Sequence, residues 1–222
     1  MNKNVNCVLK KVKFLGHIIS EDGISADDSK IQAVLSLNYP KDVKDLRRFL
    51  GMINYMRKFL PSFSSISKPL TDLLCTKNEW CWDKTHEVCF DQLKKLISST
   101  PVLALYDFNK KTRVSADSSS YGIGGVIEQL QQDNVWKPIA YTSRTLTETE
   151  TRYAQIEKEA LALTWVSERF SDYLTGIEFE LRTDHKPLVQ LLGKKPIHDL
   201  DRKSGSAGMP RPRERSRMPS SA

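Results

Sequence analysis

Three carboxylates in the second half of the chain have the residue types and the context of a metal-dependent hydrolytic site. Asp117 precedes three serines, Glu159 lies in a long helical pattern, and Asp184 closes a strand-like segment. Gathered carboxylates repel one another unless a cation holds them ionised. Mg²⁺ accepts such oxygen ligands and leaves room for water and phosphate oxygens. Two such ions can activate water and stabilise the leaving oxygen of a phosphodiester, so phosphodiester hydrolysis is a candidate chemistry.

Each of these residues also has an ordinary structural explanation. An aspartate beside Ser or His at a strand end is commonly a cap or turn residue. A helical glutamate is usually solvated, and at 100° per residue Glu157 and Glu159 lie on opposite shoulders of the apolar stripe. Periodicity therefore leaves open which of these two glutamates faces a sheet.

The elements around the carboxylates follow an α/β order. Apolar residues at helical steps run from Tyr153 to Leu174, and Gly176 ends this helix. Alternating or β-rich segments predict four strands, at 113–119, 121–130, 136–144 and 177–185. If the first and fourth strands are neighbours, Asp117 and Asp184 come side by side, and the helix offers a glutamate to both.

The first hundred residues are mostly helical. Two short strands are predicted around Gly16, closed by a turn at Asp22-Gly23. Helical patterns follow at three places: from a capping box of Ser25 and Asp28 through Leu37, from Val43 to Leu60 with Pro61 as the stop, and after Asp83.

Composition excludes several protein classes. The 222 residues are 39% hydrophobic and 27% charged, which is globular and allows one or two domains. The sequence offers no stretch near the ~20 apolar residues of a membrane span and no secretory signal pattern. The lack of an apolar span favours no membrane partner, and four cysteines without metal or disulfide spacing favour an intracellular, reduced chain.

The net charge of +7 is unevenly distributed. Residues 201–222 carry six basic and two acidic residues, so this tail holds +4 and the rest of the chain +3. Rich in Ser, Gly, Pro and Arg and without apolar periodicity, the tail is expected to be disordered. A linker or plain terminus is favoured over an RNA-binding arm.

Several motifs that follow one another in one order resemble a known family. The segments SADSSSYGIGGVIEQ, PIAYTSRTL, TRYAQIEKEALAL and FELRTDHKPL are similar to the ribonuclease H (RNase H) domain of gypsy-type long-terminal-repeat retrotransposon polyproteins. Upstream, the end of a reverse transcriptase palm, its thumb and its connection are resembled by KFLGHIISEDGI, LRRFLGMINYMRKFLPSFSSISKPLTDLL and the segment from Trp80 to Leu105. The resemblance implies an RNase H-like mixed β-sheet with packed helices after a helical region. The expected domains are 1–105 (palm end, thumb and connection), 106–200 (RNase H-like, incomplete) and 201–222 (disordered basic tail).

The resemblance assigns roles to residues. It implies that Asp117, Glu159 and Asp184 bind two Mg²⁺ ions, with Mn²⁺ as a substitute, to cleave RNA paired to DNA, and it favours Glu159 over Glu157, which is expected to support a neighbouring basic group. Small residues would let the nucleic-acid backbone approach. The expected nucleic-acid contacts, to an RNA–DNA hybrid or primer-template, are Phe14, Leu15, Gly16 and His17 of a primer-grip-like hairpin, Arg47, Arg48, Arg57 and Lys58 of the thumb helix, and Ser118, Ser119, Ser120, Gly122 and His185.

Three departures from the family pattern qualify these expectations. The usual Thr-Asp-Ala is Ala116-Asp117-Ser118 here, which keeps the carboxylate. The Tyr-x-Asp-Asp motif of the polymerase centre is absent from the sequence, and so is a fourth acidic residue within Ala-Asp-x-Leu-Ser-Arg after residue 200. Polymerisation by this chain is therefore not expected, and nuclease activity and stability are expected to be reduced.

The motifs leave three hypotheses. The first is a retrotransposon reverse transcriptase/RNase H fragment with a metal-dependent nuclease site. The second is a catalytically dead remnant that only binds nucleic acid, distinguished by salt-sensitive binding without cleavage. The third is a protein-interaction adaptor that uses the exposed edge of the sheet.

Overall fold

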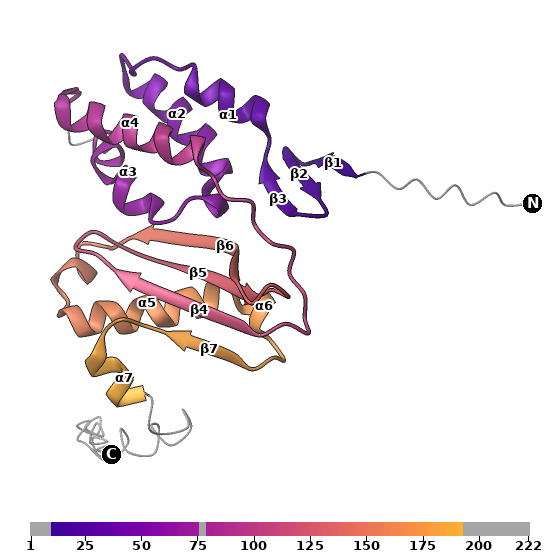
Figure 1. The fold of residues 1–222 in the computed structure, drawn as a ribbon. Coiled ribbons are helices and arrows are strands. Elements are labelled where there is room, and N and C mark those ends of the chain that lie inside the picture. Colours follow the sequence, from indigo (N-terminus) through magenta and orange to yellow (C-terminus); the bar gives the residue numbers. More distant parts are fainter. Residues whose placement is uncertain (1–9, 76–78, 193–222) are drawn as a thin grey trace, which may run out of the picture. The chain divides into compact units, whose positions relative to one another are not determined.

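The fold contains two β-sheets. The computed structural model describes residues 10–75 and 79–192. The first sheet is an antiparallel meander of β1 (Lys11–Phe14), β2 (His17–Ser20) and β3 (Gly23–Ala26). The second has the order β6-β5-β4-β7 and is formed by β4 (Thr112–Ser118), β5 (Gly122–Leu130), β6 (Trp136–Thr145) and β7 (Phe179–Arg182). Its first three strands are antiparallel neighbours, whereas β7 runs parallel to β4 (Figure 1).

Most helices precede the second sheet in the sequence or lie between β6 and β7. Before it are α1 (Asp28–Leu35), α2 (Val43–Tyr55), the 3₁₀ turn η1 (Arg57–Phe59), α3 (Phe63–Asp72) and α4 (Lys84–Ser98). Between β6 and β7 are the 3₁₀ turn η2 (Glu150–Arg152), α5 (Gln155–Arg169) and α6 (Ser171–Leu174). The chain from Lys186 onward forms a second unit, of which α7 (Lys186–Leu192) is described. The α/β fold class is confirmed, and no helix in the described ranges is long and apolar enough to cross a membrane.

Several predicted boundaries were wrong in the first hundred residues. Ser25 belongs to a third strand, paired with Ile18, and Asp27 caps α1 by accepting a hydrogen bond from the Ser29 N–H (3.1 Å). The second predicted helix ends at Tyr55, because the Met56 N–H bonds only three residues back and begins a 3₁₀ turn. The predicted helix after Asp83 is confirmed, with that aspartate as its cap.

Two boundaries around the second sheet also differ from prediction. The helix predicted over 153–174 is interrupted at Phe170, where α5 ends and α6 begins. The fourth strand covers only Phe179–Arg182, so Asp184 lies just beyond it. The tail expected to be disordered (201–222) lies outside the described residues.

The helical region has its own apolar core. Phe49 on α2 stacks on Phe90 of α4 with ring centroids 4.1 Å apart, and both side chains are almost fully buried. Leu46, Ile53 and Leu93 are completely buried beside them. Burial of each such side chain stabilises the fold by roughly 1.5–3 kcal/mol, which explains why the helical spacing of these residues was a dependable signal.

The second sheet is covered on both faces. Helix α5 packs on one face, where a Cβ atom added to Gly125 would lie 2.6 Å from Val166 and equally close to the Ser115 carbonyl oxygen. Helix α3 packs on the other face, where the Ser64 N–H donates to Ser143 Oγ on β6 (3.1 Å). Figure 1 shows the helical region on the β6 side of the sheet. This arrangement fixes the C-terminal end of β4 between two packed layers.

Candidate metal centre

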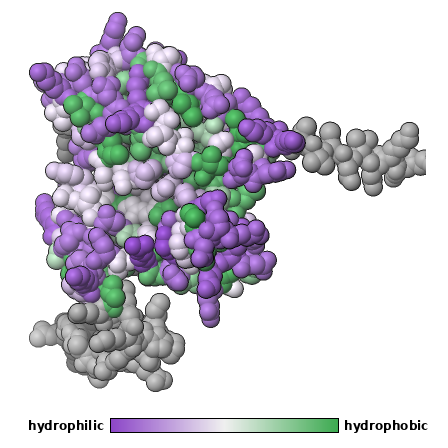
Figure 2. Space-filling model, in the orientation of Figure 1, coloured by the Kyte–Doolittle hydropathy of each residue, from purple (hydrophilic) through white to green (hydrophobic). Residues whose placement is uncertain are grey.

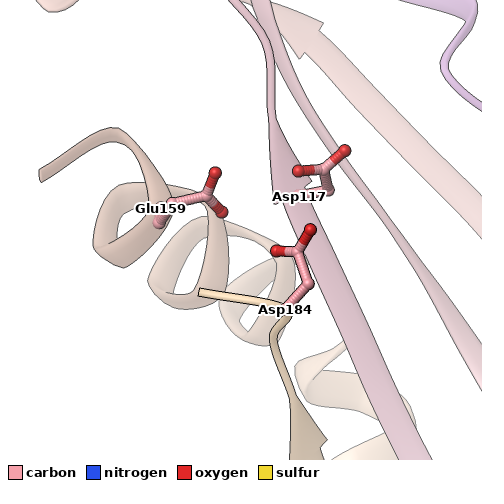
Figure 3. A group of neighbouring side chains, drawn as sticks. All are labelled: Asp117, Glu159 and Asp184. Carbon is pink, nitrogen blue, oxygen red and sulfur yellow. The ribbon is translucent and has the colours of Figure 1, made fainter. Parts of the chain in front are cut away.

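Three carboxylates from three separate elements converge at one end of the second sheet. Asp117 belongs to β4, Glu159 to the first half of α5, and Asp184 to the segment directly after β7. One oxygen from each lies within 4.8 Å of the others. Figure 3 shows the three carboxylates directed toward a common space.

The strand register brings the two aspartates together. Strands β4 and β7 run parallel, with Ser115 opposite Arg182. Asp117 and Asp184 each lie two residues further along their own segments, so they emerge at the same end of the sheet. The first and fourth strands of this sheet are therefore neighbours, which is the condition under which the two aspartates were expected to come side by side.

Glu159 approaches from the opposite side and is buried. Only 3% of the residue is exposed. Its Oε1 accepts hydrogen bonds from Ser118 Oγ (2.7 Å) and Gln155 Nε2 (2.8 Å). Its Oε2 is also buried and has no hydrogen-bond partner among the described residues. An unpartnered buried carboxylate oxygen is costly, and the Glu159 carboxylate faces two further carboxylates, so a cation is the natural missing partner.

The donor set fits a hard divalent cation. Within residues 10–75 and 79–192, no Lys, Arg or His forms an ion pair with any of the three carboxylates. Two oxygens bound to one Mg²⁺ at about 2.1 Å are at most about 4.2 Å apart. Asp117 and Asp184 are exposed, and small torsional changes of their side chains would bring the three oxygens within that range.

A groove of about 470 Å³ opens beside the two aspartates. Strands β4 and β5 and the segment after β7 line one part of it, and Pro61, Ser62 and Ser65 from the helical region line another. Small side chains dominate the lining, including Ser119, Gly122 and Gly124. In the view of Figure 2, hydrophilic residues predominate and the hydrophobic areas are separate from one another. The groove can therefore admit a polar, extended molecule close to the backbone of β4 and β5.

The serines after Asp117 have different surroundings. Ser118 is buried and gives its hydroxyl to Glu159, so this hydroxyl is occupied within the site. Ser119 is partly buried, accepts from the Gly122 N–H (3.0 Å), and is hydrogen-bonded to Ser65 of α3 through its hydroxyl (3.0 Å). Ser120 is exposed. Of the three, Ser119 lines the groove.

Glu157 and His185 are the two other predicted residues near the site. Glu157 was expected to support a basic group, but its carboxylate accepts the Ala154 N–H (2.9 Å) and caps α5, without an ion pair to any residue that the structure describes. His185 is partly buried, and its backbone N–H donates to Thr183 Oγ1 (3.2 Å). The ring nitrogen Nδ1 has no hydrogen-bond partner in the described part of the chain. Sequence reasoning missed Gln155, although its position one helical turn before Glu159 was a usable signal.

Comparison with known proteins identifies this region. The family described as "RNase H-like domain found in reverse transcriptase" matches residues 82–181. These residues belong to that family. The match includes the first two carboxylates, and Asp184 follows three residues after its end. The RNase H-like fold predicted from the motifs is thus confirmed.

Retrotransposon polyproteins are among the relatives of this chain. A Pol polyprotein from transposon 297 of Drosophila melanogaster is 38% identical over 195 residues, which are 87% of this chain and 18% of that protein. The Tf2-3 polyprotein of Schizosaccharomyces pombe is 34% identical over 198 residues, 84% of this chain and 15% of that protein. The chain thus spans less than a fifth of the length of these two relatives.

Solved structures share the fold. The foamy viral protease-reverse transcriptase in complex with dsDNA has a TM-score of 0.71 at 24% identity, covering 86% of this chain and 40% of that one. The same viral protein in complex with an RNA/DNA hybrid gives 0.66, covering 85% and 26%. The match to the fold therefore extends well beyond the RNase H-like region, over most of the chain.

The FLGH turn forms the predicted hairpin. Leu15 and Gly16 connect β1 to β2 with φ of 46° and 67°, and the Phe14 and Leu15 side chains are largely exposed. His17 is partly buried and stacks on Tyr55 of α2 with ring centroids 5.2 Å apart. Burial, with Lys58 and Lys30 nearby, lowers the pKa of His17. This hairpin does not line the groove of the acidic trio within the described residues.

The four basic residues assigned to the thumb helix separate into two pairs. Arg47 and Arg48 are exposed on α2. Arg57 and Lys58 lie beyond the end of that helix, on η1, and burial lowers the pKa of both. Arg57 donates to Ser64 Oγ (3.0 Å), so it links η1 to α3. The placement of all four on one helix was wrong, because the helix ends at Tyr55.

Proposed function

We propose that the RNase H-like domain of this chain hydrolyses the RNA strand of RNA–DNA hybrids with divalent cations held by Asp117, Glu159 and Asp184. The observation that carries the proposal is the convergence of three carboxylates, one of them with a buried, unpartnered oxygen, without an ion-pair partner in the described ranges. Two findings support an RNA–DNA hybrid as the substrate. The family is found in reverse transcriptases, and the foamy viral protein of similar fold has been solved in complex with an RNA/DNA hybrid.

The exposed and the buried carboxylates would hold the cation from different sides. Asp117 and Asp184 reach the groove and would hold the cation where an extended strand can approach it. Glu159 holds it from the buried side. Two Mg²⁺ ions, or Mn²⁺ in their place, would supply an activated water and stabilise the leaving oxygen of the phosphodiester. The small residues of β5 let a sugar-phosphate backbone come close to the sheet.

We further propose roles for the preceding segment. Residues 1–105 would serve as palm end, thumb and connection, with Phe14 to His17 as a primer-grip-like turn. The exposed Arg47 and Arg48 are suited to phosphate contacts. Arg57 and Lys58 are less available for such contacts because both are half-buried.

Hybrid cleavage tests the proposal against a binding-only chain. Purified chain is incubated with a labelled RNA–DNA hybrid, the matching double-stranded RNA and the matching double-stranded DNA, with Mg²⁺ or with EDTA. Mg²⁺-dependent cleavage of the hybrid RNA alone, lost in Glu159→Gln and kept in Glu157→Gln, is expected. Salt-sensitive binding of all three duplexes without cleavage would replace the proposal with a non-catalytic nucleic-acid-binding role.

A further inference from the structure

A three-membered hydrogen-bond network surrounds one oxygen of Glu159. Gln155 Nε2 lies 2.8 Å from Glu159 Oε1 and 2.9 Å from Ser118 Oγ, and that hydroxyl donates to the same carboxylate oxygen. The network joins the end of β4 to the first turn of α5. Both donors converge on Oε1, while Oε2 has no partner in the described part of the chain.

We infer that Ser118 and Gln155 are positioning residues that hold Glu159 with Oε2 free for the cation. The inference rests on the proposed metal site. A glutamate side chain has three torsions, and an unrestrained one would lose entropy when it binds a metal. Two donors fixed to one oxygen remove that freedom in advance and leave the second oxygen as the ligand, which is how outer residues commonly orient metal-binding carboxylates.

The two donors have different local support. Ser118 is almost completely buried, and its backbone lies in β4, paired with Ile123 of β5. Gln155 is the first residue of α5, one turn before Glu159, so its amide and the carboxylate lie on the same side of the helix. An alanine at position 118 could not donate this hydrogen bond to Glu159. The rigid strand and the helix therefore orient the glutamate together.

Metal affinity, measured apart from cleavage, tests this role. EDTA-treated full chain is titrated with Mn²⁺, and free Mn²⁺ is followed by electron paramagnetic resonance for wild type, Ser118→Ala, Gln155→Leu and the double variant. Loss of an orienting partner typically weakens metal affinity about 10-fold or more, so we expect at least that loss in the double variant and a smaller one in each single variant. Ser118→Thr, which restores a hydroxyl, should recover most of the affinity.

Controls separate positioning from general stability. Ser98→Ala and Gln132→Leu change exposed residues on α4 and after β5, and both should bind Mn²⁺ as wild type does. Thermal unfolding without metal shows whether each variant is folded. A double variant that binds Mn²⁺ within twofold of wild type, or more tightly, overturns the inference, even if its melting temperature has fallen. Asp117→Asn is titrated in the same way. If wild type and Asp117→Asn bind the same amount of Mn²⁺, the proposed metal site is wrong, and this inference is wrong with it.

Discussion

Neutralising Glu159 should stabilise the metal-free protein and abolish its response to Mg²⁺. Glu159→Gln keeps the shape of the side chain, and its amide oxygen can still accept from Ser118 and Gln155. The amide nitrogen would then take the position of the unpartnered Oε2, in a side chain whose carboxylate now faces two aspartates. The substitution converts repulsion into an attractive contact, at the cost of a metal ligand.

The expected size follows from the spacing of the carboxylates. Two like charges 4.8 Å apart repel by about 1 kcal/mol in water and by about 3.5 kcal/mol at an effective dielectric constant of 20. Both aspartates are exposed, so the lower value applies, and two pairs give about 2 kcal/mol. Weaker hydrogen bonds to the neutral amide remove about 1 kcal/mol of this. The net gain of about 1 kcal/mol corresponds to a melting temperature about 2–4 °C higher.

Thermal unfolding in EDTA and over a Mg²⁺ series measures both effects. Wild type should gain about 1.4 kcal/mol when Mg²⁺ reaches ten times its dissociation constant, and Glu159→Gln should gain much less. Glu157→Gln is the matched control, because glutamine also completes the helix cap, and it should melt and respond as wild type does. A Glu159→Gln protein that melts below wild type in EDTA would contradict the repulsion inferred between the three carboxylates. A Glu159→Gln protein that keeps the full Mg²⁺ response would contradict the role of Glu159 as a metal ligand.

Three further predictions concern the scaffold. Ser143→Ala should lower the free energy of unfolding by about 1–3 kcal/mol in urea, because the buried Ser64 N–H loses its acceptor and the Ser64 hydroxyl keeps only the hydrogen bond from Arg57; an unchanged value would show that this link adds nothing. The Arg144 guanidinium holds the pKa of Glu150 at about 2, below its usual 4.5, so this carboxylate stabilises the fold above pH 4.5 and progressively less as the pH falls toward 2. Glu150→Gln should therefore be less stable than wild type at pH 7, with a difference in urea midpoint that fades over that range; a difference independent of pH would contradict this. Gly125→Ala should cost about 1–3 kcal/mol by calorimetry, because its Cβ would collide with the β4 backbone and a valine of α5, and wild-type stability would show that α5 can shift.

Most helices and strands could be predicted from the sequence, because the spacing of the apolar residues agreed with the residues that begin and end the elements. The pattern from Leu46 to Ile53 and the cap at Asp83 correspond to real elements, since a buried helical stripe and a capping carboxylate are both local signals. Helix ends were harder to predict. Nothing in the residues 56–60 forbids an α-helix, and the change to a 3₁₀ turn lets Arg57 reach Ser64 on another element.

The candidate site was predictable in membership but not in hydrogen bonding. Asp117 and Asp184 come together if the first and fourth strands are neighbours, a condition that the sequence pattern alone left open and that the parallel pairing of β4 and β7 meets. The choice of Glu159 over Glu157 came from the family resemblance, because periodicity does not give the direction in which α5 packs on the sheet. The connection between Ser118 and Gln155 spans 37 residues, and no local pattern reports such a contact.

Crystals of the chain soaked in Mn²⁺ and measured at the manganese absorption edge would show whether the three carboxylates hold a cation. We expect an anomalous peak within coordinating distance of Asp117, Glu159 and Asp184, with no peak there in Asp117→Asn crystals grown in the same form. Well-ordered crystals in which the three carboxylates bind no manganese, at concentrations that support hybrid cleavage, would contradict the assignment of this site.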